Sequence, residues 1–150
     1  EDFPTLKIIT SLPISNFKKN IIVIKGNWHS ETLTDIEMRN LYQDSEFVIV
    51  PLKETFQPSG QSTCLQAMAC SKAVLISDIK GIWDKQLLKH KENIFFVKSG
   101  DKEDLNLGIR LFLKDIKLRE SIAKKGRQLI INHFNIVNMK NKLIKILEEE

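Results

Sequence analysis

Residues 47–78 read FVIVPLKETFQPSGQSTCLQAMACSKAVLISD, and this stretch decides the fold. It opens with a continuously apolar run over 47–51 and passes through a polar loop containing Gly60. Small and apolar residues then recur at helical spacing over 62–71, before a second continuously apolar run over 73–77. Strands without polar alternation are typical of a parallel sheet covered by helices on both faces. The stretch therefore predicts a strand, loop, helix and strand of a parallel α/β sheet.

The same reasoning extends outward to both ends of the chain. Apolar runs predict three further strands, at residues 6–10, 21–25 and 94–97. Helical spacing predicts helices at residues 31–43 and 83–91, and then three successive helices that begin at Asp101, at Asp115 and near Val137. The last of these extends to Glu150 and carries an apolar stripe of Leu143, Ile144 and Leu147. The predicted fold is α/β, an open, doubly wound parallel sheet with C-terminal helices, in a single domain over residues 1–150.

Composition narrows the class of protein without selecting a function. The 150 residues are 42% hydrophobic and 28% charged, as expected for one globular domain. No apolar run is long enough to span a bilayer and no secretory signal opens the chain, so we expect a soluble, cytoplasmic location. The net charge of +4 suits an anionic partner, although most basic residues fall on helices where a solvated face explains them. Cys64 and Cys70 match no metal-binding spacing, and we expect them to be small buried residues and no metal to be bound.

The loop that follows residues 47–51 is the best candidate for a ligand site. Ligands of such sheets bind beyond the carboxyl ends of the strands, and here the loop leads directly into a helix. Free N–H groups, a positive dipole end and the close backbone approach that Gly60 permits all suit a phosphate. A second interpretation stays open, in which Gly60 makes a turn and Ser62 or Thr63 caps the helix.

A family resemblance appears at the same residues. Pro51, the segment GQSTCLQAMACSKAVLISD at 60–78 and the later ENIFFV at 92–97 follow one another in a known order. Gly100-Asp101 and the helix that ends at Phe134 continue this order. The pattern resembles the C-terminal, nucleotide-sugar-binding domain of family 4 (group 1) retaining glycosyltransferases, which have the GT-B fold.

The resemblance implies roles for named residues. The amides of Gly60, Gln61, Ser62 and Thr63 would hold the diphosphate of a nucleotide sugar. Gln66 occupies the position where the family usually has a glutamate that binds the ribose. The base would meet the segment Gly26, Asn27 and Trp28, where Trp28 either stacks on the base or packs against the sheet.

One position of the loop departs from the family pattern. The family's earlier glutamate falls at Pro58 or Ser59, and neither residue is acidic. Glu54 is the one acid in this loop and therefore a weak catalytic candidate, with a solvated loop carboxylate as the alternative.

The function that the resemblance implies is donor binding in a retaining, metal-independent glycosyltransferase of glycan biosynthesis that uses no cofactor besides its nucleotide-sugar substrate. The acceptor would be held by an N-terminal domain of the same protein, which this chain lacks together with the first basic βα unit. The isolated chain should therefore bind but not transfer sugar. We expect no nucleic-acid partner, whereas peripheral membrane contact is compatible with the full-length enzyme. The alternative function is that of a non-catalytic nucleotide- or sugar-binding scaffold domain derived from such an enzyme.

Overall fold

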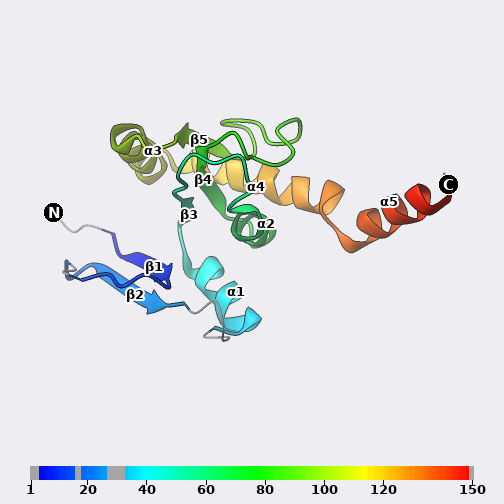
Figure 1. The fold of residues 1–150 in the computed structure, drawn as a ribbon. Helices are drawn as coiled ribbons and strands as arrows, with labels where there is room; N and C mark the ends of the chain where they lie inside the picture. The colour runs from blue at the N-terminus through cyan, green and yellow to red at the C-terminus, as the bar shows by residue number, and fades with distance from the viewer. Residues whose placement is uncertain (1–3, 16–17, 27–32, 149–150) are drawn as a thin grey trace. The chain divides into compact units, whose positions relative to one another are not determined.

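The computed structural model describes residues 4–15, 18–26 and 33–148. The chain divides into two compact units, Glu1–Asn40 and Leu41–Glu150. Figure 1 shows the course of the chain through both units. The elements in chain order are β1 (Leu6–Thr10), β2 (Ile21–Lys25), α1 (Asp35–Asp44), β3 (Phe47–Val50), α2 (Gln61–Ala69), β4 (Ala73–Asp78), β5 (Phe95–Lys98), α3 (Lys102–Lys114), α4 (Ile116–His133) and α5 (Ile136–Glu148).

The first unit contains a parallel pair of strands and the start of a helix. β1 and β2 pair from Leu6 opposite Ile21 to Thr10 opposite Lys25. Helix α1 begins with a capping box, in which Thr34 Oγ1 accepts from the Glu37 N–H and Glu37 Oε2 accepts from the Thr34 N–H. None of the described residues of β1 and β2 is fully buried, in contrast to the strands of the second unit.

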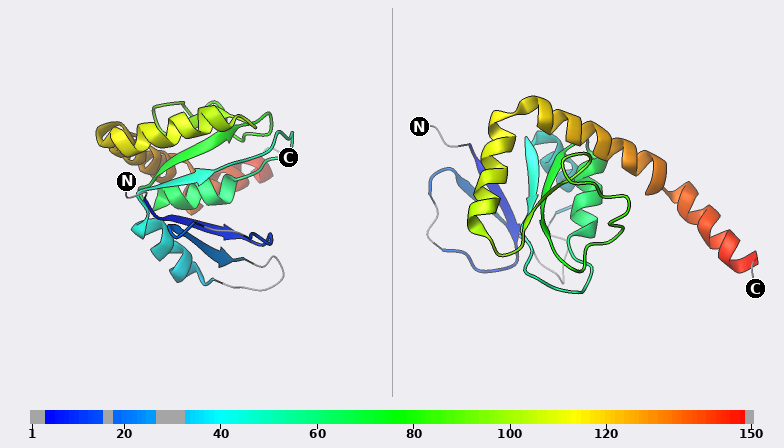
Figure 2. Two further views of the ribbon diagram at one scale, coloured as in Figure 1. Left: turned by 90° about the vertical axis from the view of Figure 1, so that its left-hand side faces the viewer. Right: turned by 90° about the horizontal axis from the view of Figure 1, so that it is seen from above.

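The second unit is a three-layer arrangement around a parallel sheet with the order β3-β4-β5. The central strand β4 is buried from Ala73 to Ser77, as its continuously apolar sequence predicts. Figures 1 and 2 show α2 and α3 on opposite sides of this sheet. The five predicted strands are thus present and parallel, and they lie in two sheets, one in each unit.

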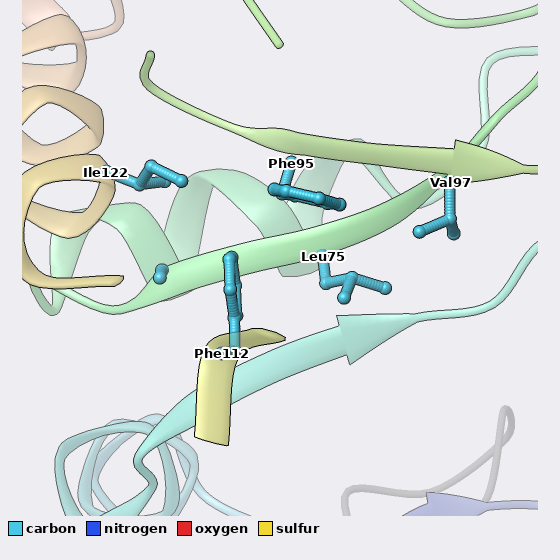
Figure 3. Close-up of a cluster of buried hydrophobic side chains, with 6 residues drawn as sticks. Leu75, Phe95, Val97, Phe112 and Ile122 are labelled. Carbon is cyan, nitrogen blue, oxygen red and sulfur yellow. The ribbon is translucent and has the colours of Figure 1, made fainter. Parts of the chain in front are cut away.

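The core of the second unit lies between the sheet and helices α3 and α4. Leu75 and Val97 point into this layer from β4 and β5, and Phe112 and Ile122 meet them from the helices (Figure 3). Phe112 packs edge-on against Phe95, with ring centroids 5.2 Å apart. This burial anchors α3 and α4 to the strands that carry the candidate site.

The predicted starts of two C-terminal helices are confirmed. The Asp101 carboxylate accepts hydrogen bonds from the N–H groups of Glu103 and Asp104 and so caps α3. Asp115 caps α4 in the same way, because its Oδ1 accepts from the Leu118 N–H at 2.9 Å.

The helix predicted over 83–91 is wrong, because this segment forms a series of turns. Asp84 and Lys91 adopt left-handed φ values of 42° and 61°, which a continuous α-helix cannot contain. The buried side chain of Asn93 holds the turns together: its Nδ2 donates to Leu87 O at 2.8 Å and its Oδ1 accepts from Lys89 N at 2.9 Å.

Helix α5 has the expected length, but the stripe of Leu143, Ile144 and Leu147 is not buried. These side chains are 52%, 40% and 72% exposed. The amphipathic pattern is real, yet no other described part of the chain covers it. Within the described ranges, no helix combines the length and the apolar character that crossing a membrane would require.

Candidate functional site

The loop between β3 and α2 is fixed at its start to the neighbouring strands. The Leu52 N–H donates to Ser77 Oγ at 3.0 Å, and the hydroxyl of Ser99 donates to Leu52 O at 3.0 Å. Ser77 ends the buried part of β4, and Ser99 directly follows β5. The carboxyl ends of the three strands are therefore tied together by two serine side chains.

The middle of the same loop packs on the loop after β4. Glu54 Oε1 accepts from the Lys80 N–H at 2.9 Å, and Thr55 O accepts from the Gly81 N–H at 2.8 Å. A Cβ at Gly81 would lie 2.3 Å from Gln57 O, so this close approach requires glycine. The exposed carboxylate of Glu54 thus fastens one loop to the other, and its predicted catalytic role stays a prediction.

Helix α2 begins without a side-chain cap. Gly60 is the N-cap residue, with a left-handed φ of 73°, and no side chain accepts from the first turn. The first helical hydrogen bond runs from Cys64 N to Gly60 O at 3.0 Å, which leaves the N–H groups of Gln61, Ser62 and Thr63 directed beyond the helix start. No acidic residue lies in this turn to offset the positive end of the helix dipole.

These observations test one part of the second interpretation of the loop. Ser62 and Thr63 lie inside α2, so the alternative in which one of them caps the helix is wrong. The N-cap position belongs to Gly60, where a Cβ would lie 2.9 Å from Val50 Cγ1. Glycine is required here because a Cβ has no room and because the backbone is left-handed. The backbone N–H groups of the first turn of α2 therefore have no side-chain cap.

Gln66 lies one turn further along α2 and is exposed. Its Oε1 accepts a hydrogen bond from Tyr42 Oη at 3.2 Å. Cys64, Ala67 and Met68 form the buried face of α2, and Leu65 and Ala69 are half-buried.

Tyr42 is a residue that sequence reasoning missed. It is 7% exposed and lies in the part of α1 that belongs to the second unit. Burial raises the pKa of Tyr42, and a hydrogen bond with the Thr63 side chain opposes that rise. The helical pattern of residues 31–43 indicated that Tyr42 lies on an apolar face, but it carried no signal that the hydroxyl reaches α2.

The predicted base-binding segment is only partly described. Gly26 directly follows β2 in the first unit, where its N–H donates to Thr10 O at 2.8 Å. Asn27 and Trp28 lie outside the described residues. The structure therefore brings together Gly60, Gln61, Ser62, Thr63 and Gln66 on one helix, with Glu54 in the loop before it.

Among the residues that the structure describes, the other reactive side chains form no second centre. Cys64 is completely buried, and burial raises the pKa of its thiol to about 12. Cys70 is half-buried rather than fully buried. Over residues 4–15, 18–26 and 33–148, no group of three or more His, Cys, Asp and Glu side chains could hold a metal ion.

A parallel α/β sheet whose carboxyl edge carries an uncapped helix start defines a class of proteins that bind anionic ligands there. A model of the family described as glycosyl transferases group 1 matches residues 16–129, and the chain belongs to this family. The resemblance found in the sequence is confirmed.

Individual relatives support the same assignment. Over 127 residues the chain is 27% identical to N,N'-diacetylbacillosaminyl-diphospho-undecaprenol alpha-1,3-N-acetylgalactosaminyltransferase of Campylobacter jejuni, an alignment that covers 74% of this chain and 32% of the relative. The fold is similar to that of Anabaena HepE in complex with UDP-glucose, with a TM-score of 0.69, 16% identity and coverage of 89% of this chain and 33% of HepE.

A third comparison concerns a separate domain. The C-terminal domain of the group 1 glycosyl transferase LpcC from Francisella tularensis has a TM-score of 0.62 and 24% identity, covering 79% of this chain and 55% of that one. These likenesses confirm the predicted α/β, Rossmann-like fold class. The chain spans about a third of the length of the Campylobacter and Anabaena proteins.

Proposed function

We propose that this chain is the donor-binding domain of a glycosyltransferase and binds a nucleotide-diphosphate sugar at the start of α2. The observation that carries the proposal is the uncapped helix start at Gly60, which lies at the carboxyl edge of the sheet and has no acid in its first turn. Membership of a glycosyltransferase family favours a nucleotide sugar as the ligand. The solved complexes of HepE with UDP-glucose and with UDP support this choice.

The chemistry assigned to this site is stabilisation of the leaving group. The amides of Gly60, Gln61, Ser62 and Thr63 hold the diphosphate, on which negative charge grows as the bond to the sugar breaks. Gln66 contacts the ribose, and Gly26, Asn27 and Trp28 meet the base. Helix-terminal amides supply positive potential, so we propose that neither a metal ion nor a cofactor is needed.

The whole protein is proposed to contain an acceptor-binding N-terminal domain and a further basic βα unit outside these 150 residues. Closure of two domains over the donor would exclude water and favour transfer over hydrolysis. Transfer would retain the anomeric configuration, as in the family that the sequence resembles, and the 150-residue chain alone would bind without transferring. The name of the Campylobacter relative, which includes a diphospho-undecaprenol, supports a role in glycan assembly. We further propose that the full-length enzyme is cytoplasmic and touches the membrane peripherally.

A second candidate function is a non-catalytic binding or scaffold domain. It is favoured by the loss of both family glutamates, because Pro58 or Ser59 and Gln66 stand at their positions. A scaffold domain that binds a nucleotide would differ from the enzyme in turnover and not in affinity, whereas one that binds only a sugar would differ in both.

Calorimetric titration tests the proposal directly. The 150-residue chain should bind UDP or another nucleoside diphosphate more tightly than the matching uncharged nucleoside, because most of the interaction comes from the phosphates. Undetectable affinity for each of UDP, GDP and ADP, or affinity no greater than that of the matching nucleoside, contradicts donor binding at this helix. Hydrolysis or transfer from a nucleotide sugar by the full-length protein then separates the enzyme from the scaffold.

A further inference from the structure

The hydrogen bond between Tyr42 and Gln66 fixes the orientation of a side chain at the candidate site. Tyr42 is held in the core, whereas Gln66 is exposed on the second turn of α2. Their contact joins Tyr42 Oη to Gln66 Oε1 at 3.2 Å, across 24 positions of sequence. A buried anchor therefore holds one end of an exposed amide.

The direction of this hydrogen bond determines what Gln66 presents to solvent. A glutamine side chain has one carbonyl oxygen, which accepts, and one NH₂ group, which donates. The Tyr42 hydroxyl donates to the carbonyl oxygen, so the NH₂ group is the part of Gln66 left for a ligand. Within the described part of the chain, no hydrogen bond engages that NH₂ group.

We propose that Tyr42 is a positioning residue that turns the NH₂ group of Gln66 toward the nucleotide, so that Gln66 recognises a ribose hydroxyl oxygen as a hydrogen-bond donor. The inference rests on the proposed function and adds the polarity of one contact to it. A carboxylate at this position, as in the resembled family, can only accept hydrogen bonds when ionised. Tyr42 and Gln66 together thus reverse the donor and acceptor roles while keeping a ribose contact.

Pre-orientation also affects affinity. A free glutamine side chain loses rotamer freedom when it binds a ligand, and a side chain already held by Tyr42 loses less. The benefit concerns only ligands that reach Gln66. Inorganic diphosphate, which contains no ribose, should not respond to Tyr42.

The first experiment examines the hydrogen bond without any ligand. Nitrogen-15 relaxation of the Gln66 side-chain amide should show an ordered NH₂ group in the wild-type chain and a mobile one in Tyr42→Phe. The side-chain amide of Gln128, on α4, serves as an internal reference that should not change. Identical mobility of the Gln66 amide in both chains overturns the positioning role.

The second experiment measures affinities for UDP, uridine and inorganic diphosphate in a double-mutant cycle of Tyr42→Phe and Gln66→Ala. Each single change should weaken UDP and uridine binding by about threefold to tenfold, the range of one neutral hydrogen bond, and leave diphosphate binding unchanged. In the Gln66→Ala background, Tyr42→Phe should weaken UDP and uridine binding less than it does in the wild type, because the part of its effect that acts through Gln66 is already lost and only its hydrogen bond with Thr63 remains. Gln128→Ala is the matched control and should bind all three probes like the wild type.

The outcomes separate this inference from the proposed function. UDP binding that is unaffected by Tyr42→Phe, or losses that add fully in the double variant, overturns the role of Tyr42 and leaves donor binding intact. Failure of the wild-type chain to bind UDP, uridine and diphosphate overturns both the ligand role of Gln66 and donor binding at this helix. Weakened binding of all three probes by Tyr42→Phe shows a general loss of structure and also overturns the inference.

Discussion

Single residues at the site have roles that are set by space and conformation as much as by chemistry. Gly60 combines a left-handed φ with a position against Val50, and Gly100 has nearly the same φ of 75° in open space. Substitutions at Gly60 and Gly100 therefore separate the loss of stability caused by the left-handed backbone from the loss caused by crowding.

Gly60→Ala should destabilise the fold more than Gly100→Ala. The left-handed conformation costs an alanine about 1–2 kcal/mol at either position. Crowding against Val50 should add about 1–3 kcal/mol at Gly60 alone, because a Cβ would lie 2.9 Å from Val50 Cγ1. Urea unfolding of both variants measures the difference, and equal losses would show that the start of α2 can relax around a methyl group.

His90 should make stability depend on pH. Its Nδ1 accepts from the Phe96 N–H at 3.0 Å, which requires the neutral ring. Desolvation and the nearby Lys91 charge lower the pKa of His90 from its ordinary value of 6.5. The folded state therefore binds the proton less readily than the unfolded state, so this contribution is complete above pH 6.5 and is lost as the pH falls through the lowered pKa.

Unfolding free energies measured from about pH 8 to pH 5 test this sign. His90→Gln, whose carbonyl can still accept from Phe96 N, should reduce the loss of stability over that range. His133→Gln, at the exposed end of α4, provides the control substitution. A steeper loss in His90→Gln than in the wild type would contradict the assignment.

At the scale of elements, strands were predicted more successfully than turns. The apolar runs located all five strands to within a residue or two, because aliphatic and β-branched runs favour strands even where they are only partly covered. Only β4 is buried along nearly its whole length, and no described residue of β1 or β2 is buried. The segment 83–91 has apolar residues at helical spacing as well, but its turns depend on the side chain of Asn93, just beyond the segment, and on positive φ values. Neither property appears in a periodicity pattern.

Asn93→Ala should therefore loosen the segment 83–94. The change removes two hydrogen bonds and leaves Lys89 N and Leu87 O without their partner, at a cost of about 2 kcal/mol. Asn106→Ala, on the exposed face of α3, should change stability by less than about 0.5 kcal/mol. Thermal or urea unfolding compares the two, and equal effects would mean that Asn93 does not organise the turns.

The candidate site shows the same division between local and distant signals. Gly60 through Thr63 could be predicted because the loop, the glycine and the helix are consecutive in sequence. The contact between Tyr42 and Gln66 could not be predicted, because it joins α1 to α2, which β3 separates in sequence. It also depends on how far the two side chains extend. The sequence also could not predict that α2 starts at Gly60 without a side-chain cap, because Ser62 and Thr63 are both favourable capping residues.

At the scale of the whole molecule, the chain matches its family over most of its length and covers only part of its longer relatives. Residues 16–129 match the glycosyltransferase family, whereas the chain spans about a third of its longer relatives. The stripe of α5 is amphipathic but exposed, and the strands of the first unit are only partly covered. Sequence patterning predicts that a face is apolar, but it does not specify which surface covers that face.

The location of the phosphate is the central claim, and amide chemical-shift mapping with UDP tests it most directly. Adding UDP to the nitrogen-15-labelled chain should produce its largest shifts at Gly60, Gln61, Ser62 and Thr63, and inorganic diphosphate should perturb the same amides. We expect the phosphates there because the first turn of α2 has N–H groups without a side-chain cap and contains no acidic residue. Shifts concentrated on α3, α4 or α5, with the amides of residues 60–63 unchanged, would contradict it.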